Sequence, residues 1–209
     1  MDVLHKLASI QGRRDEQPNQ DLALELIHDD DREGIRLIAE NLHNKNKKIQ
    51  NDCIKVLYEI GYIKPELIAD YVADFIQLLH TKNNRLTWGC MIALSTIGRL
   101  KPKDIFRKLD ELKFVIEKGS VITIDAGVKT LALVASTDTT YRTEIFPWLI
   151  NHLQTCRPKE VPMHGEFIAE AVDGTTREIF LQEIEKRKVS LTDTQMKRVN
   201  KLIKKVKNA

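Results

Sequence analysis

A repeat of 37 residues constrains the fold of this chain more than any other feature. Ile35, Val72, Leu109 and Phe146 are spaced at this interval, and four further sets of apolar residues keep the same spacing. A fixed period in this range is typical of stacked helical units, because each unit buries its apolar face against its neighbours. The sequence therefore predicts an all-α fold built from repeated helix pairs. The four further sets begin at Ile38, Leu42, Leu57 and Ile60.

Each copy of the repeat predicts two helices joined by a polar turn. In the first copy, the apolar residues of 35–42 form one helical stripe and those of 49–60 form a second. Gly61 follows, at a position where a glycine in the left-handed conformation would end the helix. Pro65 and Pro102 are placed to begin the next helices, since proline is tolerated in a first helical turn.

We expect a single domain over residues 1–209. Residues 1–33 are predicted to form N-terminal cap helices, residues 34–175 four regular repeats, and residues 176–209 a C-terminal capping pair. Terminal units that differ from the regular repeats are usual in such arrays, because one of their faces meets water.

The two ends carry weaker signals. We expect short helices at 2–10 and 20–28, with a polar loop between them. Near the C-terminus, Thr175 with Glu178 and Thr192 with Gln195 have the spacing of capping boxes, which begin helices.

Composition indicates a soluble globular protein, with 42% hydrophobic and 30% charged residues. No apolar run approaches the roughly 18 residues that span a membrane, and no basic stretch followed by an apolar stretch marks a secretion signal. Three cysteines in such a chain favour reduced thiols and a cytoplasmic location. Cys53 and Cys90 share one repeat position and are expected in the core.

The repeat resembles the HEAT family, with armadillo-like repeats as its near neighbour. Residues 84–98, NRLTWGCMIALSTIG, look like the second helix of such a unit, and residues 51–61 are a weaker copy. The resemblance implies a right-handed superhelical solenoid of about five helix pairs, whose second helices line a concave face. It implies binding more often than catalysis, although a fold alone does not determine a function.

The sequence contains none of the common catalytic or nucleotide-binding motifs, and no CxxC pair. We therefore expect no cofactor and no catalytic residues. His43 and His80 share one repeat position, but helices in a stack lie about 10 Å apart, which is too far for one zinc ion. We expect no metal.

The expected partner-binding face comes from the second helix of each repeat. Trp88 lies off the apolar stripe beside Arg85, where an exposed tryptophan would favour binding of a protein partner. The alternative is that Trp88 packs on the neighbouring turn. The candidate residues are Asn51, Lys55, Tyr58, Arg85, Trp88, Arg99, Asp125 and Lys129.

Basic residues gather in the turns between the paired helices and in the last predicted helix. Such residues can follow the phosphates of a nucleic acid or an acidic protein surface, or they can simply be solvated. The candidates are Lys45, Lys47, Lys48, Lys82, Lys118, Lys197, Arg198, Lys201, Lys204 and Lys205.

Three hypotheses follow from these patterns. The leading one is a non-enzymatic, cytoplasmic scaffold or adaptor that binds a protein partner on the concave face. The second is a nucleic-acid-binding protein that uses the basic turns and the last helix. The third is a DNA glycosylase, because HEAT-like folds include alkylpurine DNA glycosylases, and Trp88, Arg99 and Asp125 could then form the site.

Overall fold

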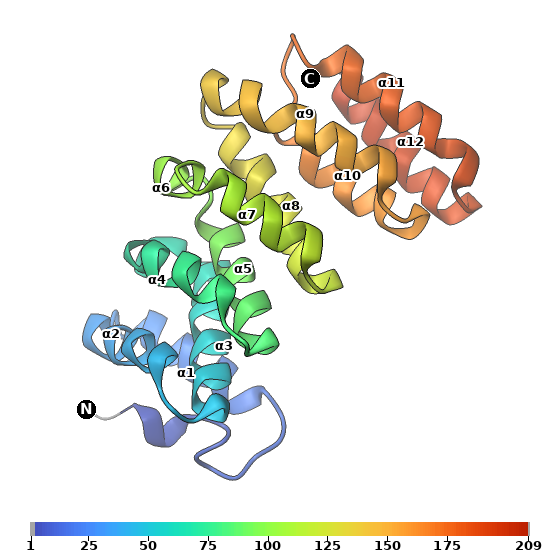
Figure 1. The fold of residues 1–209 in the computed structure, drawn as a ribbon. Helices are drawn as coiled ribbons and strands as arrows, with labels where there is room; N and C mark the ends of the chain where they lie inside the picture. The colour runs from blue at the N-terminus through green and yellow to red at the C-terminus, as the bar shows by residue number, and fades with distance from the viewer. Residues whose placement is uncertain (1–2, 209) are drawn as a thin grey trace. The chain divides into compact units, whose positions relative to one another are not determined.

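Helices make up all the regular secondary structure of residues 3–208, which are the residues that the computed structural model describes (Figure 1). The chain divides into two compact units, Met1–Gly127 and Val128–Ala209. The boundary falls inside helix α8 (Val121–Ala135). None of the helices within the described range is long and apolar enough to cross a membrane.

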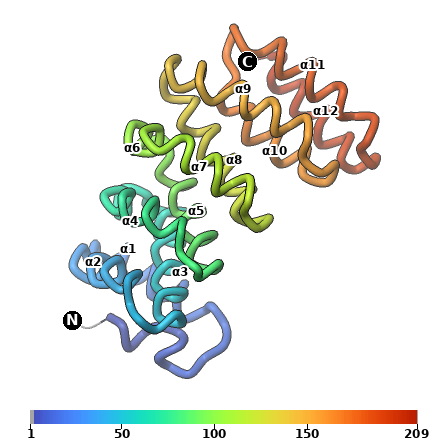
Figure 2. The backbone as a smooth tube through the Cα atoms, in the orientation of Figure 1, coloured from blue at the N-terminus to red at the C-terminus, as the bar shows by residue number. Residues whose placement is uncertain are grey.

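The first unit stacks successive helices along the chain, as the backbone trace in Figure 2 shows. Helix α3 packs against α1, α2 and α5, and α4 packs against α5. The helices of this unit that precede α8 are α1 (Gln17–His28), α2 (Arg32–Glu40), α3 (Lys47–Ile63), α4 (Val72–Gln77), α5 (Asn84–Ile97), α6 (Pro102–Phe106) and α7 (Leu109–Lys118).

The predicted repeat positions form the core. Every residue at the five positions is buried except Leu109, which is half-buried. Their helical spacing places them on one face of each helix, so burial of that face stabilises the stack at about 25 cal/mol per Å² of apolar surface removed from water. The all-α repeat fold predicted from the 37-residue period is confirmed.

The second and third copies contain more helical segments than the predicted pair. Pro65 begins a short 3₁₀ turn (Pro65–Leu67), a second turn follows (Ala69–Tyr71), and Pro102 begins the short helix α6. Proline can begin a helical segment but cannot continue one, because it lacks an N–H group. The two prolines therefore begin added short segments rather than α4 and α7.

Gly61 lies near the C-terminus of its helix, as predicted, but it does not adopt the left-handed conformation. It lies inside α3, which continues to Ile63. A Cβ atom at this position would lie only 2.3 Å from Oγ1 of Thr96 in α5. The glycine therefore permits close approach of α3 and α5, and its left-handed conformation is not used.

The N-terminal segment differs from the predicted pair of short helices. Asp2 lies outside the described residues, and Leu4–Lys6 form only a single 3₁₀ turn. Helix α1 begins at Gln17, three residues before the predicted start, with Pro18 in its first turn. Proline suits that place because the first N–H groups of a helix have no partner within the helix.

The second unit contains the end of α8 and the helices that follow it along the chain (Figures 1 and 2). Helix α10 packs against α9, α11 and α12, and α11 also packs against α9 and α12. The buried side chains of Phe180 and Ile184 on α11 are 0% exposed and form part of this core. The helices are α9 (Thr139–Thr155), α10 (Val161–Ala169), α11 (Arg177–Arg187) and α12 (Asp193–Lys207).

One of the two predicted capping boxes is confirmed. Thr192 and Gln195 exchange hydrogen bonds at the start of α12. Thr175 and Glu178 do not form the second box, because Asp173 takes its place. The Asp173 carboxylate accepts from the backbone N–H of Thr175 at 2.9 Å and of Thr176 at 3.1 Å, and from both threonine hydroxyls.

Asp173 should make the second unit sensitive to acid. Hydrogen bonds from Thr175 and Thr176 lower the pKa of Asp173 from 3.8 to about 2. Because the pKa is lower in the folded state, the ionised carboxylate stabilises that state in full at pH values above the unfolded pKa of 3.8. This contribution is lost as pH falls from 3.8 to about 2. We expect Asp173→Asn to lower the free energy of unfolding by about 0.5–2 kcal/mol at neutral pH. In urea titrations, the gap between the variant and the original chain should close over that acid range; a constant gap would contradict this account.

Candidate functional site

Three aromatic side chains meet on the first unit where α3 and α5 lie side by side. The ring of Tyr58 lies 5.9 Å from Tyr62 and 6.2 Å from Trp88, measured between centroids. Arg85 lies 5.8 Å from the centroid of the Trp88 ring, and Lys55 lies 4.9 Å from that of Tyr58. The chain thus brings together Lys55, Tyr58, Arg85 and Trp88 of the predicted face.

The members of this cluster differ in exposure. Lys55 and Tyr58 are only 8% and 6% exposed, so they support the cluster from beneath rather than forming an open surface. Burial raises the pKa of the Tyr58 hydroxyl. Tyr62, on the same helix, is 55% exposed. Trp88 and Arg85 are half-buried, and they and Tyr62 present the surface that a partner can reach.

The other predicted face residues are placed as follows. Asn51 accepts a hydrogen bond from the Asn83 amide at 2.9 Å, which ties α3 to the start of α5. Arg99 is exposed and Asp125 is half-buried. Lys129 belongs to the second unit, where burial lowers the pKa of its ammonium group.

A pocket of about 470 Å³ adjoins this cluster, and Arg85 belongs to both. We call it the Arg85 pocket. Its floor comes from α3 and its other wall from the N-terminal segment that precedes α1. It is lined by Ala8, Ser9, Gly12, Arg13, Arg14, Asp15, Glu16, Lys48, Asn51, Asp52 and Arg85.

Buried polar groups attach the N-terminal segment to α3. The Asp52 carboxylate accepts from the Ser9 backbone N–H at 2.8 Å and from the Asn19 amide at 2.9 Å. The Asn19 carbonyl oxygen in turn accepts from the Ala8 N–H at 3.0 Å. Asn19 is 0% exposed and Asp52 is 7% exposed, so these bonds satisfy groups that water does not reach.

Two polar atoms of the Arg85 pocket have no hydrogen-bond partner among the described residues. They are Oγ of Ser9 and Nε of Arg85, and both are buried. Such orphaned groups are rare in folded proteins and call for an explanation, because an unsatisfied buried donor costs about 1–3 kcal/mol.

Positive side chains outnumber negative ones in the pocket once its internal ion pairs are set aside. Arg13 pairs with Asp15 at 2.8 Å, and Arg85 pairs with Glu16. Arg14 and Lys48 are exposed, and the described residues provide neither with an acidic partner within ion-pair distance. The lining includes four basic residues and three acidic ones, which leaves a formal charge of +1.

The predicted basic residues lie on the surface of both units. Lys45, Lys47, Lys48, Lys82 and Lys118 are exposed in the first unit. In the second unit, Lys197, Lys201, Lys204 and Lys205 are exposed along α12. Arg198 forms an ion pair with Glu166, in which Nε of Arg198 donates to the carboxylate at 2.7 Å.

His43 and His80 each contact a carboxylate on a later helix. Nε2 of His43 lies 3.4 Å from Asp74, and Nε2 of His80 lies 2.7 Å from Glu111. Since Asp74 and Glu111 are themselves 37 positions apart, the same contact recurs in two successive repeats. These two histidines link neighbouring repeats of the first unit through carboxylates rather than sharing one cluster.

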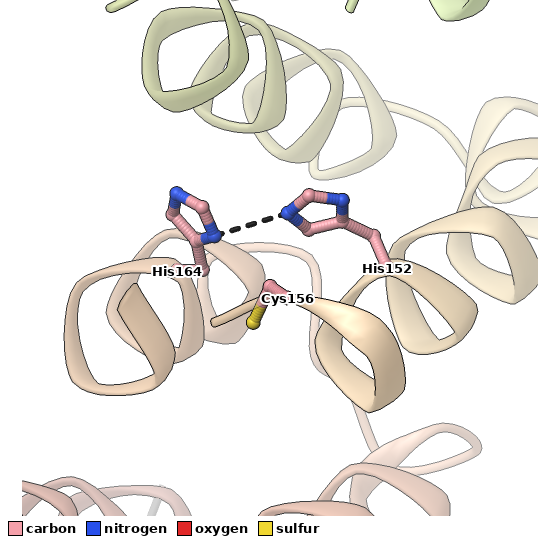
Figure 3. Close-up of side chains that lie close together, drawn as sticks. All are labelled: His152, Cys156 and His164. Atoms are coloured by element: carbon pink, nitrogen blue, oxygen red, sulfur yellow. Dashed lines mark hydrogen bonds between the residues drawn. The ribbon is translucent and has the colours of Figure 1, made fainter. Parts of the chain in front are cut away.

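A different set of histidine and cysteine side chains comes together in the second unit (Figure 3). His152 and Cys156 lie four residues apart at the end of α9, and His164 faces them from α10. One ligand atom from each residue lies within 4.8 Å of the other two. Nε2 of His152 and Nδ1 of His164 are 3.0 Å apart, so one ring nitrogen donates to the other.

Burial controls the protonation of this cluster. Burial, with a smaller contribution from His164, lowers the pKa of His152 from 6.5 to about 4. Burial also raises the pKa of the Cys156 thiol from 9.0 to about 11, against the opposing effect of Arg187. Cys53 and Cys90 are 0% exposed, as we predicted for core residues, and burial raises the pKa of both thiols.

Sequence reasoning missed both the N-terminal wall of the Arg85 pocket and the cluster around Cys156. Ser9 and Glu16 reach the site only because the chain folds back: Ser9 bonds Asp52 43 residues away, and Glu16 pairs with Arg85 69 residues away. No local pattern reports such contacts. The His152 and Cys156 pair did carry a signal, since an i,i+4 spacing places two side chains on one helix face.

The repeat fold is shared with solved structures of engineered proteins. One engineered protein aligns over 100% of this chain and 98% of its own length, with a TM-score of 0.66 and 15% identity. A designed armadillo repeat protein aligns over 97% and 91%, with a TM-score of 0.67 and 13% identity. A designed armadillo repeat protein in complex with the peptide (KR)4 aligns over 88% and 85%, with a TM-score of 0.66 and 13% identity.

No family model matches the sequence, and comparison with curated proteins gives no match. The structural likeness confirms that the chain has a helical-repeat fold of the kind seen in these designed repeat proteins. Because the sequence identities are 13–15%, the likeness establishes the fold and nothing about function.

Proposed function

We propose that this protein is an adaptor that binds an extended, acidic segment of a partner protein in the Arg85 pocket and across Trp88. The observation that carries the proposal is the net positive lining of the Arg85 pocket, which adjoins the accessible ring surface of Trp88 and Tyr62.

Charge complementarity favours a carboxylate as the ligand of this pocket. Arg14 and Lys48 add two cations to the pocket beside the Arg85 guanidinium. Hydrogen bonds between charged partners are roughly twice as strong as neutral ones, and they are stronger still in a site that is partly closed to water. An aspartate or glutamate side chain of a partner segment has the size and charge to occupy this position.

The aromatic cluster supplies the apolar contact next to the pocket. Trp88 and Tyr62 offer ring surface, and Arg85 connects this surface with the pocket. Tryptophan, tyrosine and arginine are the residues that most often dominate binding energy at protein interfaces. An apolar side chain adjacent to the acidic residue of the partner would cover this surface.

The complex of a designed armadillo repeat protein with (KR)4 supports peptide binding by this fold in general. The peptide in that complex is basic, and this describes what the designed protein binds. In the present chain the pocket lining is net positive, so we expect the opposite charge preference. The cytoplasmic location of the protein stays a prediction from its cysteines.

Trp88→Ala is expected to weaken binding of such a segment about 30-fold, because a central tryptophan contributes about 2 kcal/mol or more. Random peptides displayed on phage would be selected on the full-length protein, and synthetic copies would be measured by fluorescence anisotropy. The selected peptides should contain aspartate or glutamate next to an apolar residue. Lys48→Glu should weaken the same peptides and Arg85→Ala should weaken them further.

Phe114→Ala and Lys118→Glu are the matched controls, since both residues are exposed and lie outside the Arg85 pocket. Neither should change affinity more than about twofold. Selection of basic peptides, or equal binding by Trp88→Ala, would contradict the proposal. Tight binding of a labelled duplex or single-stranded oligonucleotide, with an affinity that falls steeply with salt, would favour nucleic acid as the partner instead.

A further inference from the structure

The cluster at the junction of α9 and α10 contains two nitrogen donors and one sulfur donor. Within the described residues, His152, Cys156 and His164 place one ligand atom each within 4.8 Å of the others. Ligand atoms around a zinc ion with bonds of about 2.0–2.3 Å lie roughly 3–4 Å apart in tetrahedral geometry. The two imidazole nitrogens already lie 3.0 Å apart, close to this separation.

The backbone that carries these side chains is held in place independently of any ion. His152 and Cys156 share one face at the end of α9, and a 3₁₀ turn (Pro158–Glu160) leads directly into α10. The Glu160 side chain closes this turn by accepting from the Arg157 N–H at 3.1 Å and from its guanidinium at 2.8 Å. The three donors are thus presented on rigid elements, as a metal site requires.

Neighbouring groups also orient the ligands. The His152 ring stacks on Trp148, with centroids 5.5 Å apart and planes inclined by 14°. The Cys156 carbonyl accepts from the Arg187 guanidinium at 2.6 Å, which holds the end of α9 against α11. Contacts of this kind around the ligands tune metal sites and limit ligand motion.

The burial of the three donors limits how much solvent reaches the site, and their chemistry selects the ion. His164 is 0% exposed and Cys156 is 8% exposed, while His152 is half-buried and forms the open side. Imidazole and thiolate donors suit zinc, whereas magnesium and calcium prefer oxygen. Three protein ligands would leave a fourth position for water or an external ligand, reached past His152.

We propose that His152, Cys156 and His164 form a binding site for one zinc ion. On binding, the Cys156 thiol releases its proton to solvent, and its sulfur bonds the metal as a thiolate. The proton between the two rings leaves its nitrogen for solvent, and that ring takes up a proton on its outer nitrogen, so both facing lone pairs bond the metal. No oxidation or reduction takes place.

Cobalt(II) provides a direct test because it substitutes for zinc and is coloured. Untagged full-length protein, kept reduced, would be titrated with cobalt(II) and then with zinc(II). We expect a sulfur-to-cobalt charge-transfer band and the visible bands of a four-coordinate ion, saturating at one ion per chain. Zinc should abolish both and should raise the midpoint of thermal unfolding by mass action.

Ligand variants distinguish this site from adventitious binding. Cys156→Ser should remove the charge-transfer band. His152→Gln should weaken zinc binding at least about 100-fold, which exceeds the usual effect of losing a group that only contacts a ligand. The double variant Cys53→Ala, Cys90→Ala leaves Cys156 as the only thiol and should keep the band. His164→Gln replaces a fully buried side chain, so circular dichroism would accompany the binding measurement to verify that this variant is folded.

The absence of a charge-transfer band in the original chain would overturn the proposal. An unchanged band in Cys156→Ser would do the same, because the sulfur ligand would then be elsewhere. Since His152 is half-buried, His152→Gln should fold, and undiminished zinc affinity in that folded variant would also overturn the site. These measurements are independent of peptide binding, which involves the first unit only.

Discussion

Replacing Phe75 with alanine should lower the free energy of unfolding of the first unit by about 3–5 kcal/mol. Phe75 occupies one of the repeating apolar positions on α4 and is 0% exposed. Removing a buried phenylalanine ring loses its transfer free energy and leaves a cavity that the surrounding helices fill only in part. Because α4 packs against α5, the variant should also loosen the helix that carries Trp88.

The two tryptophans allow each unit to be followed separately, since Trp88 lies in the first unit and Trp148 in the second. Urea unfolding of Phe75→Ala would be recorded by fluorescence in a Trp148→Phe background and in a Trp88→Phe background. The transition reported by Trp88 should move to lower urea. A coincident shift of the Trp148 transition would mean that the two units unfold together, as neighbouring repeats can.

Phe114→Ala is the matched control for Phe75→Ala, because the Phe114 side chain is 60% exposed. Its effect should stay within about 0.5 kcal/mol, as for most surface substitutions. Equal destabilisation by the two variants would mean that the repeating positions do not form the core of this unit.

The second large effect is expected at Asn19. Asn19→Leu would leave the Ala8 N–H and one oxygen of the Asp52 carboxylate without their partners. Each unsatisfied buried group costs about 1–3 kcal/mol, so the variant should lose at least about 2 kcal/mol of unfolding free energy. The N-terminal wall of the Arg85 pocket would also lose its attachment, so peptide affinity should fall even where the protein remains folded.

Asn19→Asp provides a sharper version of this test. It would place two carboxylates at a contact that now measures 2.9 Å, and like charges at that distance raise the pKa of one of them. A raised pKa in the folded state means that the folded protein takes up a proton as pH falls through that value. The destabilisation relative to the original chain should therefore shrink between neutral and mildly acidic pH.

Asn84→Leu is the control, since Asn84 is exposed at the first residue of α5. It should change stability by less than about 0.5 kcal/mol at all pH values. A destabilisation by Asn19→Asp that does not vary with pH would show that the Asn19 and Asp52 contact is not maintained in solution.

The amino-acid sequence by itself determined the class of fold and the identity of its core. The 37-residue period places Ile38, Phe75, Leu112 and Leu149 at equivalent positions, and all four are 0% exposed. This succeeds because the helical period is a local property, so that residues three, four and seven apart share a face wherever the helix lies. The same local reasoning placed Trp88, Arg85 and Tyr58 near one another, since they lie on the second helices of neighbouring repeats.

The tertiary structure alone decided what surrounds those residues. The Arg85 pocket needs the N-terminal segment to return to α3 and α5, through contacts between Ser9 and Asp52 and between Glu16 and Arg85. The zinc-binding cluster needs α10 to turn back so that His164 meets His152. Both depend on the path of the chain between helices, which is set by burial and hydrogen bonding over the whole unit and leaves no period in the sequence.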